Sequence, residues 1–470
     1  TICHESQIRN KIDDADRIHD PAGVRVPAYH PDTPEVRKDW AQYYDRITMM
    51  DKLVGKNLQE LEKSGLAEDT IVFYYGDHGS GMPRSKRMPY NSGLHVPLVV
   101  YIPEKWRSLA TPDYQSGGAS DRLVSFVDLA PTLLSLCGVE IPKHMQGHAF
   151  LGPQATGPQP YIYGFRGRMD ERIDFMRSVT DGRYVYIRNY MPHLPCGQFV
   201  DYMFQTPTTR VWHQMFLDGK LTPAQARFWQ PKPVEELYDL TSDPDEVHNL
   251  AGDAKHAETL ARLRQAHLEH IERIQDVGFL PEHRQMTYGG PKSPYDRVRA
   301  HGKYSAGKMH NVAATCVDPA TTPEMLASYL REASRWAPYE DVVTYWAAVG
   351  VLAHGGEHFA VNRELVRELA AGRSPHAGDA ARIVAAEALG QYGDKSDLEL
   401  ALGVLLDYGH AENRTVYNGI AALNAIDRLG AKAAPIREAV AGLPRKDSNA
   451  PGRTSSYCDR LIEKILADLK

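Results

Sequence analysis

An apolar run that ends in an acidic and an imidazole side chain constrains this chain more than any other feature. Residues 71–75 are β-branched or aromatic without a polar interruption, and Gly76-Asp-His-Gly79 follows directly. Such a run is typical of a strand that is buried on both faces of a parallel sheet. Open α/β sheets collect ligands at the carboxyl ends of their strands, where Asp77 and His78 stand. A carboxylate beside an imidazole can bind a divalent ion, although the same residues could form a turn that only ends the strand.

The segments on either side of this run predict a helix and a second strand. Residues 43–61 carry apolar side chains at helical spacing, and Ser64-Gly65 after them is a helix stop. Residues 94–102 form another apolar run. We expect this run to be a second buried strand, parallel to the first.

The loop between the two expected strands is basic. Arg84, Lys86 and Arg87 fill three of four consecutive positions. A charge run of this kind is usually solvated. Because this run lies close to Asp77 in the sequence, an anion-binding site is favoured as the alternative.

Over roughly residues 1–280, the chain resembles the sulfatase family of the alkaline phosphatase superfamily. Gly76-Asp-His-Gly79 resembles the family's second metal-binding segment, and Lys86, ahead of Pro97, matches the lysine that contacts the sulfate. Residues 124–147 look like the helix and loop that follow in the family. Residues 235–251 are similar to the signature of its C-terminal subdomain.

The resemblance implies roles for particular side chains. Asp77 and His78 would be ligands of a calcium ion (Ca2+), and Lys86 would be a catalytic residue that holds the sulfate. His4, in Thr1-Ile-Cys-His-Glu-Ser-Gln7, resembles the histidine that protonates the leaving group. An imidazole is suited to proton transfer near neutral pH. His4 can equally be an ordinary polar residue near a chain end.

The nucleophile of such an enzyme has no counterpart in the sequence. Sulfatases of this type use a formylglycine made in a Cys/Ser-x-Pro/Ala-x-Arg segment, and none of the five cysteines lies in that context. Asp13-Asp14 has no apolar strand before it, so it does not resemble the family's first acidic pair. We therefore expect the chain to begin within a catalytic domain, to be inactive alone, and to have either the N-terminal half or a homo-oligomeric copy as a partner.

Arginines in residues 163–177 lead into a hairpin that we expect around Asp181-Gly182. Arginine pairs bidentately with carboxylate and sulfate, so this approach could hold an acidic sugar. The arginines could instead pair on the surface with nearby acids. The candidate substrate-binding residues are Arg84, His95, Arg166, Arg168 and His193.

Several segments beyond Met176 look most like the heparan N-sulfatase (sulfamidase) branch of the family, which acts on N-sulfated glucosamine. The chain departs from that branch at Lys86, where sulfamidase has an arginine, and at His78, where it has an asparagine. An O-sulfated saccharide therefore stays open as the substrate.

The last third of the chain has a helical repeat. Residues 343–355, 381–393 and 418–430 recur at offsets of 38 and 37. A period near 40 with small residues and a terminal glycine resembles HEAT-like helix pairs. A generic helical bundle would give a similar pattern.

The predicted fold class is α/β: part of an alkaline-phosphatase-like sheet between helices, a small antiparallel subdomain and an all-α HEAT-like domain. The expected boundaries are 1–155 for the catalytic part, 156–290 for the subdomain, 291–320 for a linker and 321–470 for the helical domain. The net charge of −6 argues against nucleic acid as a partner, and no apolar stretch reaches the length of a membrane span.

The function that we predict is hydrolysis of a sulfate ester or a sulfamate on a sulfated saccharide. Family resemblance, rather than any segment of the sequence, favours a periplasmic or other extracytoplasmic location. Two alternatives remain: a phosphodiesterase or phosphonate monoester hydrolase of the same superfamily, and a non-catalytic module for acidic-glycan binding or assembly.

Overall fold

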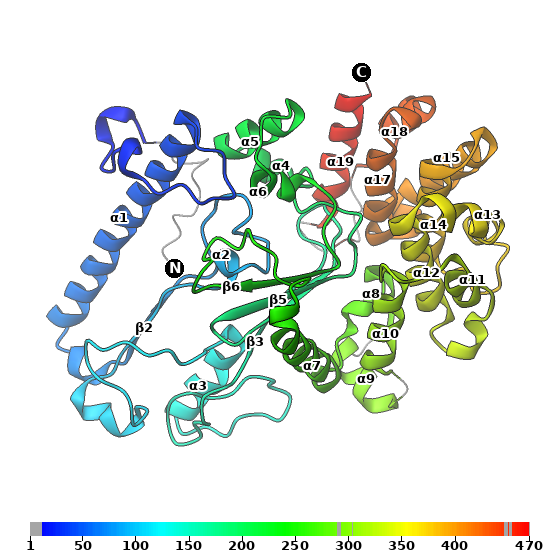
Figure 1. The fold of residues 1–470 in the computed structure, drawn as a ribbon. Helices are drawn as coiled ribbons and strands as arrows, with labels where there is room; N and C mark the ends of the chain where they lie inside the picture. Colours follow the sequence, from blue (N-terminus) through cyan, green and yellow to red (C-terminus); the bar gives the residue numbers. More distant parts are fainter. Residues whose placement is uncertain (1–11, 289–292, 303, 446–449, 451–453, 470) are drawn as a thin grey trace.

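The structure, a computed structural model, describes residues 12–288, 293–302, 304–445, 450 and 454–469. His4, the predicted leaving-group acid, lies outside the described residues. Figure 1 shows three regions in chain order: a long helix with a strand pair at one side, a four-stranded sheet in the middle, and a stack of helices at the other side. The fold is mixed α/β and rich in helices.

Helix α1, Pro34–Lys63, contains the predicted helix and is longer. Thr33 caps its first turn by accepting a hydrogen bond from the Val36 amide, and Pro34 fills the first helical position. The extra turns form because Val36, Trp40 and Ala41 are buried against neighbouring segments. The predicted stop is confirmed, since the helix ends at Lys63.

Strands β1, Val72–Tyr75, and β2, Leu98–Tyr101, pair in antiparallel register, so the prediction of parallel strands is wrong. The residues between them fold back on themselves: the Gly76 amide donates to the Pro97 carbonyl, and the Gly79 amide donates to that of Gly93. The chain thus returns beside β1 without the crossover that parallel pairing needs. Burial on both faces is also wrong, because Tyr75 is 46% exposed.

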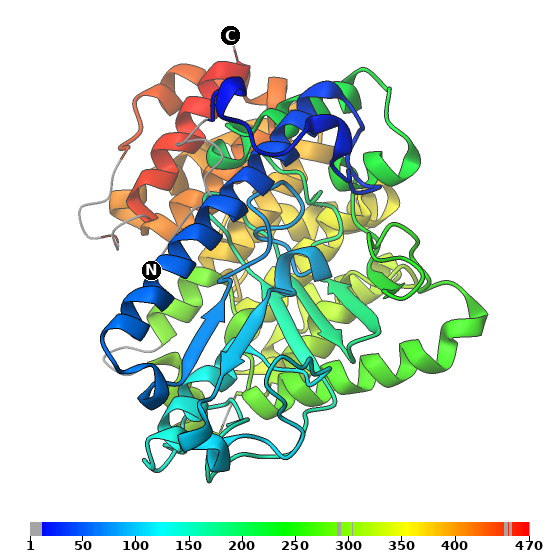
Figure 2. The same ribbon diagram turned by 90° about the vertical axis from the view of Figure 1, so that its left-hand side faces the viewer.

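A second sheet has the order β3-β4-β5-β6, with every pair antiparallel. The strands are Ile162–Arg166, Met176–Thr180, Tyr184–Asn189 and Glu235–Asp239. The hairpin predicted around Asp181-Gly182 is confirmed, with Gly182 at a φ of 93°. Helix α7, Ala257–Ile274, packs on β4 and β5. Figure 2 shows the β1–β2 pair alongside this sheet.

The helical region begins inside the segment that we expected to be a linker. Residues 291–320 contain α9, Pro294–His301, and α10, Ala306–Cys316. Helix α10 buries Met309 and Val312 and packs on α7 and α12. This segment therefore joins the subdomain to the helices through a shared apolar core.

The three repeat copies are helices α12, Glu340–His354, α14, Asp379–Tyr392, and α17, Val416–Leu429. Between them run α13, Gly356–Ala370, and α15, Lys395–Gly409. Helix α14 packs on all four of the others, which is how stacked helix pairs share a core. Assignment of these pairs to the HEAT family stays a prediction.

The remaining helices are short or lie at the ends of these regions. They are α2 Asn91–Leu94, α3 Leu129–Leu136, α4 Asp201–Phe204, α5 Pro207–Leu217, α6 Pro223–Ala226, α8 Glu282–Tyr288, α11 Pro323–Arg331, α16 Ala411–Arg414, α18 Arg437–Ala441 and α19 Ser455–Asp468. Within the described ranges, we find no helix with the length and apolar character that crossing a membrane requires.

Candidate active site

The loop between β1 and α2 carries Asp77, His78 and Lys86, three of the four residues predicted to bind metal or act in catalysis. Two close backbone contacts fix its path. A Cβ atom on Gly79 would lie 1.9 Å from the Ser92 carbonyl oxygen, and one on Gly93 would lie 2.3 Å from the Met88 oxygen. Both positions therefore require glycine.

Lys86 lies between two residues with unusual backbone conformations. Arg84 has a φ of 71° and Arg87 has a φ of 81°, in the left-handed region that bulky side chains seldom adopt. The Lys86 amide donates to the Ser80 carbonyl at 3.1 Å. Conformations of this kind persist only where the surroundings hold them, and they cluster at functional sites.

Arg84 is held by groups inside the protein. Its guanidinium lies between the rings of Tyr29 and Tyr90, 4.3 and 3.9 Å from their centroids. One nitrogen donates to the Glu246 carbonyl at 2.8 Å, and another lies 3.8 Å from the Glu246 carboxylate. The side chain is only 6% exposed. Arg84, which was predicted to bind substrate, therefore anchors the loop from inside the protein.

Glu246 joins Arg84 to the start of α2. Both of its carboxylate oxygens accept from the Asn91 amide at 3.0 Å, at the start of α2. Burial raises the pKa of Glu246 to about 7, and the nearby Arg84 opposes that rise. A single buried acid thus connects both ends of the loop residues 84–91.

Arg87 and Arg166 join the loop to the four-stranded sheet. The Arg87 guanidinium donates to Asp170 at 2.6 Å, and Arg166 donates to the Arg87 carbonyl at 2.7 Å. Arg166, at the end of β3, also forms an ion pair with Asp174 at 3.3 Å. The structure therefore brings Arg166 next to the Lys86 loop. Arg166 pairs with Asp174 inside the protein, whereas the alternative interpretation expects such pairs on the surface.

The Lys86 side chain is half-buried and faces an aromatic ring. Its Nζ atom lies 5.7 Å from the ring centroid of Tyr202 in α4, within the range of a cation–π contact. Tyr202 gave no signal in the sequence, because it comes from a segment more than a hundred residues away. The same is true of Glu246, and the contact of Asp170 with Arg87, 83 residues away in the sequence, is also long-range.

Asp77 and His78 are the two predicted ligands of a metal ion. Their side chains are 82% and 23% exposed, and the nearest nitrogen and oxygen are 3.8 Å apart. The His78 Nδ1 atom pairs with the Gly79 carbonyl at 2.7 Å, which leaves Nε2 toward Asp77. Calcium takes six to eight oxygen ligands, and no cluster of three or more potential ligands occurs within the described ranges. These two residues alone therefore do not fit a calcium ion.

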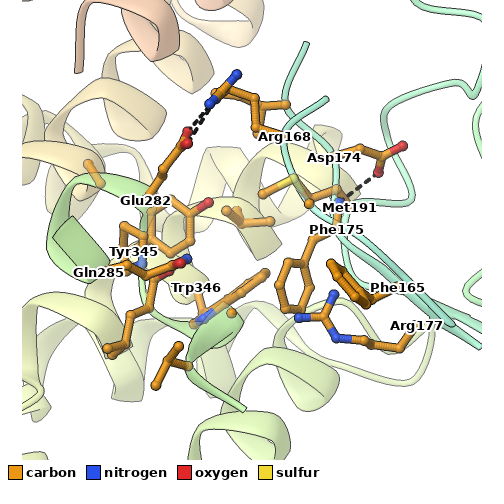
Figure 3. Close-up of a pocket in the computed structure, with 18 of the residues that line it drawn as sticks. Phe165, Arg168, Asp174, Phe175, Arg177, Met191, Glu282, Gln285, Tyr345 and Trp346 are labelled. Carbon is orange, nitrogen blue, oxygen red and sulfur yellow. Dashed lines mark hydrogen bonds and ion pairs between the residues drawn. The ribbon is translucent and has the colours of Figure 1, made fainter. Parts of the chain in front are cut away.

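The other candidate substrate residues lie apart from this loop or at its rim. His95 is exposed just after α2. Arg168 and His193 line a cavity between the four-stranded sheet and the helical region, where Arg168 donates to Glu282 of α8 at 2.7 Å (Figure 3). Burial and the nearby Arg428 hold the pKa of His193 well below its usual value.

Comparison with known proteins agrees with the motifs on this loop. Residues 8–139 match the model of the family described as Sulfatase. This part of the chain is therefore similar to the sulfatase family. It contains Asp77, His78, Lys86 and both strands of the β1–β2 pair.

Curated relatives extend the likeness further along the chain. An ulvan-active sulfatase of Formosa agariphila is 40% identical over 258 residues, which is 55% of this chain and 42% of that protein. Human N-sulphoglucosamine sulphohydrolase is 29% identical over 264 residues, covering 53% of this chain and 50% of that protein. The matched part of the chain thus spans half or less of the length of these relatives.

A solved structure described as a complex with its substrate D-glucosamine-2-N,6-O-disulfate is also similar. It is 20% identical, with a TM-score of 0.38, and the match covers 53% of this chain and 44% of that one.

Proposed function

We propose that this chain is part of a sulfatase that hydrolyses a sulfate ester or a sulfamate on a sulfated saccharide. The match of residues 8–139 to the sulfatase family carries the proposal. The geometry of the loop supports it. Lys86 is a half-buried cation between Arg84 and Arg87, whose backbones have left-handed φ values and whose side chains contact other parts of the protein. A cation on a loop that is held in this way is suited to bind the oxygens of a sulfate group.

In this proposal Lys86 holds a sulfate oxygen and offsets the negative charge that builds up as the bond to sulfur breaks. Preorganised charge acts in this way without reorganisation during the reaction. The leaving oxygen or nitrogen takes a proton, and His4 is the residue assigned to donate it. Arg84, Arg87 and Glu246 position the loop and do not touch the substrate.

Asp77 and His78 would contribute to a calcium site that further carboxylates complete. Calcium, where bound, would hold the sulfate group in place and polarise it. The nucleophile, a formylglycine, is proposed to come from a segment outside these 470 residues. The active enzyme would then contain a second polypeptide segment, and the chain alone would not turn over substrate.

Sulfate release tests the proposal. The chain is assayed alone and after co-expression with a sulfatase N-terminal half that contains Cys-x-Pro-x-Arg, with an N-sulfated and an O-sulfated glucosamine as substrates. We expect release only from the co-expressed pair. Activity of the chain by itself would contradict the proposed division of the site.

Two further measurements separate the alternatives. Faster turnover of an aryl phosphonate than of an aryl sulfate by the co-expressed pair would favour a phosphonate monoester hydrolase. Binding of a sulfated glycan that survives both Asp77→Ala and calcium removal, without turnover, would favour a binding module.

A further inference from the structure

A cavity of about 510 Å³ lies apart from the loop that carries Lys86. The cavity is formed where the four-stranded sheet, α7 and α8 meet helices α12, α14 and α17. Asp77, His78 and Lys86 do not line it. Cavities of this size hold small organic molecules in other proteins. Nothing in the proposed sulfatase chemistry uses this cavity.

The charges that line the cavity neutralise one another. Three guanidinium groups each pair with one carboxylate at 2.7 Å or less, so none of them is left to balance a charged ligand. The pairs are Arg168 with Glu282, Arg177 with Asp276, and Arg428 with Glu387. An anion that entered this cavity would lose its bound water, and none of these guanidinium groups is unpaired to offset that loss. Burial of an anion here therefore costs free energy.

The walls of the cavity are aromatic and aliphatic. Trp346 lies edge-on to Phe175, with ring centroids 5.7 Å apart, and to Tyr345, at 5.1 Å. Figure 3 shows these rings around the space, with Arg177 beside Phe175. Phe165 contributes a ring at the edge of the sheet that is 76% exposed. Aromatic walls of this kind suit a flat or cyclic apolar ligand.

Uncharged hydrogen-bonding groups remain available in the same cavity. The hydroxyl groups of Tyr345 and Tyr417 form no hydrogen bond with any residue that the structure describes. Each can both donate and accept. A polar edge on the ligand, such as a hydroxyl group, would satisfy one of them.

We propose that this cavity binds a small, uncharged, ring-bearing organic molecule with a hydroxyl group, of the phenol or cyclic alcohol class. The ring packs against Phe175 and Trp346, and the hydroxyl group pairs with Tyr345. The site bridges the subdomain and the helical stack, so occupation stabilises their contact.

Isothermal titration calorimetry with 4-methylphenol and with 4-methylbenzoate tests the inference. We expect one molecule of the phenol to bind with a Kd of about 1 mM or tighter, and the anion at least ~10-fold more weakly. Absence of phenol binding, or equal binding of the anion, would overturn the proposal.

Three variants locate the bound molecule. Ala421→Phe and Ala380→Phe fill the cavity from two half-buried helical positions, and we expect each to weaken phenol binding ~10-fold or more. Ala360→Phe, at an exposed position of α13 outside the cavity, is the matched control and leaves binding unchanged. Equal binding by all three variants would place the ligand elsewhere and reject the site.

One further variant tests the hydroxyl contact. Tyr345→Phe keeps the ring and removes the oxygen, so it should weaken 4-methylphenol several-fold and leave toluene binding unchanged. Equal loss for both ligands would contradict the assigned contact.

Discussion

Replacement of Arg84 by methionine should destabilise the protein in a pH-dependent way. The Arg84 side chain is 6% exposed and its partner Glu246 is fully buried, at 3.8 Å. Methionine keeps much of the volume and removes the charge. Breaking a buried pair from one side costs about 3–5 kcal/mol when the other charge stays ionised.

The ionisation of Glu246 sets the pH window. Burial raises its pKa from 4.5 to about 7, so the fold favours the protonated form. The stability contributed by this group is fully present below pH 4.5 and is lost as the pH rises through 7. Arg84 lowers the pKa of Glu246, so removal of Arg84 raises that pKa further. The stability contributed by protonated Glu246 is then lost at higher pH.

At pH 5 Glu246 is protonated with or without Arg84, and Arg84→Met then loses the contacts with Tyr29 and Tyr90 and the hydrogen bond to the Glu246 carbonyl, about 1–3 kcal/mol. At pH 8, one unit above the pKa of about 7, Glu246 is ionised beside Arg84 but stays protonated without it, so we expect the loss to be larger by about 1.4 kcal/mol. Urea denaturation followed by tryptophan fluorescence measures both values.

A double variant separates the buried charge from lost packing. Adding Glu246→Gln to Arg84→Met should remove the difference between pH 5 and pH 8, since glutamine does not titrate. An equal loss for Arg84→Met at pH 5 and pH 8, or a difference that persists in the double variant, would refute the reasoning.

Three other predictions concern the loop, the domain contact and the metal. Gly93→Ala should destabilise the protein by about 1–3 kcal/mol through overpacking, whereas Gly55→Ala in α1, where a Cβ meets nothing within 4 Å, should be neutral or stabilising in the same urea assay. Arg172→Met removes hydrogen bonds to Asn424 and Asp427 of α17 and should lower the Tm in a thermal scan; an unchanged Tm would show that this contact is not needed. Calcium should raise the Tm of the co-expressed pair but not of its Asp77→Asn variant, and equal shifts would exclude Asp77 as a ligand.

Elements defined by local patterns were predictable from the sequence. The stop of α1, the hairpin around Asp181-Gly182 and the three repeat helices depend on short-range signals: glycine and helical periodicity. The sulfatase motifs of residues 76–97 likewise lie on one continuous segment.

The direction of β2 and the partners of the basic loop were not predictable. An apolar run does not show which way its neighbour runs, and only the backbone contacts from Gly76 to Gly93 fix the antiparallel pairing. Asp170, Tyr202 and Glu246 approach the loop from distant segments, so no local spacing identifies them. For the same reason the sequence did not separate Arg84, which anchors the loop from inside the protein, from Lys86, to which the proposal assigns the sulfate.

The kcat/KM of Lys86→Ala in the co-expressed pair is the most direct test of a sulfate site on this loop. Lys220→Ala, at a lysine whose side chain is 65% exposed and pairs with Asp218, is the matched control. The proposed electrostatic role predicts a fall in kcat/KM of about 100-fold or more for Lys86→Ala, and no change for Lys220→Ala. Equal activity of the two variants on a sulfated glucosamine would contradict the proposed role of Lys86.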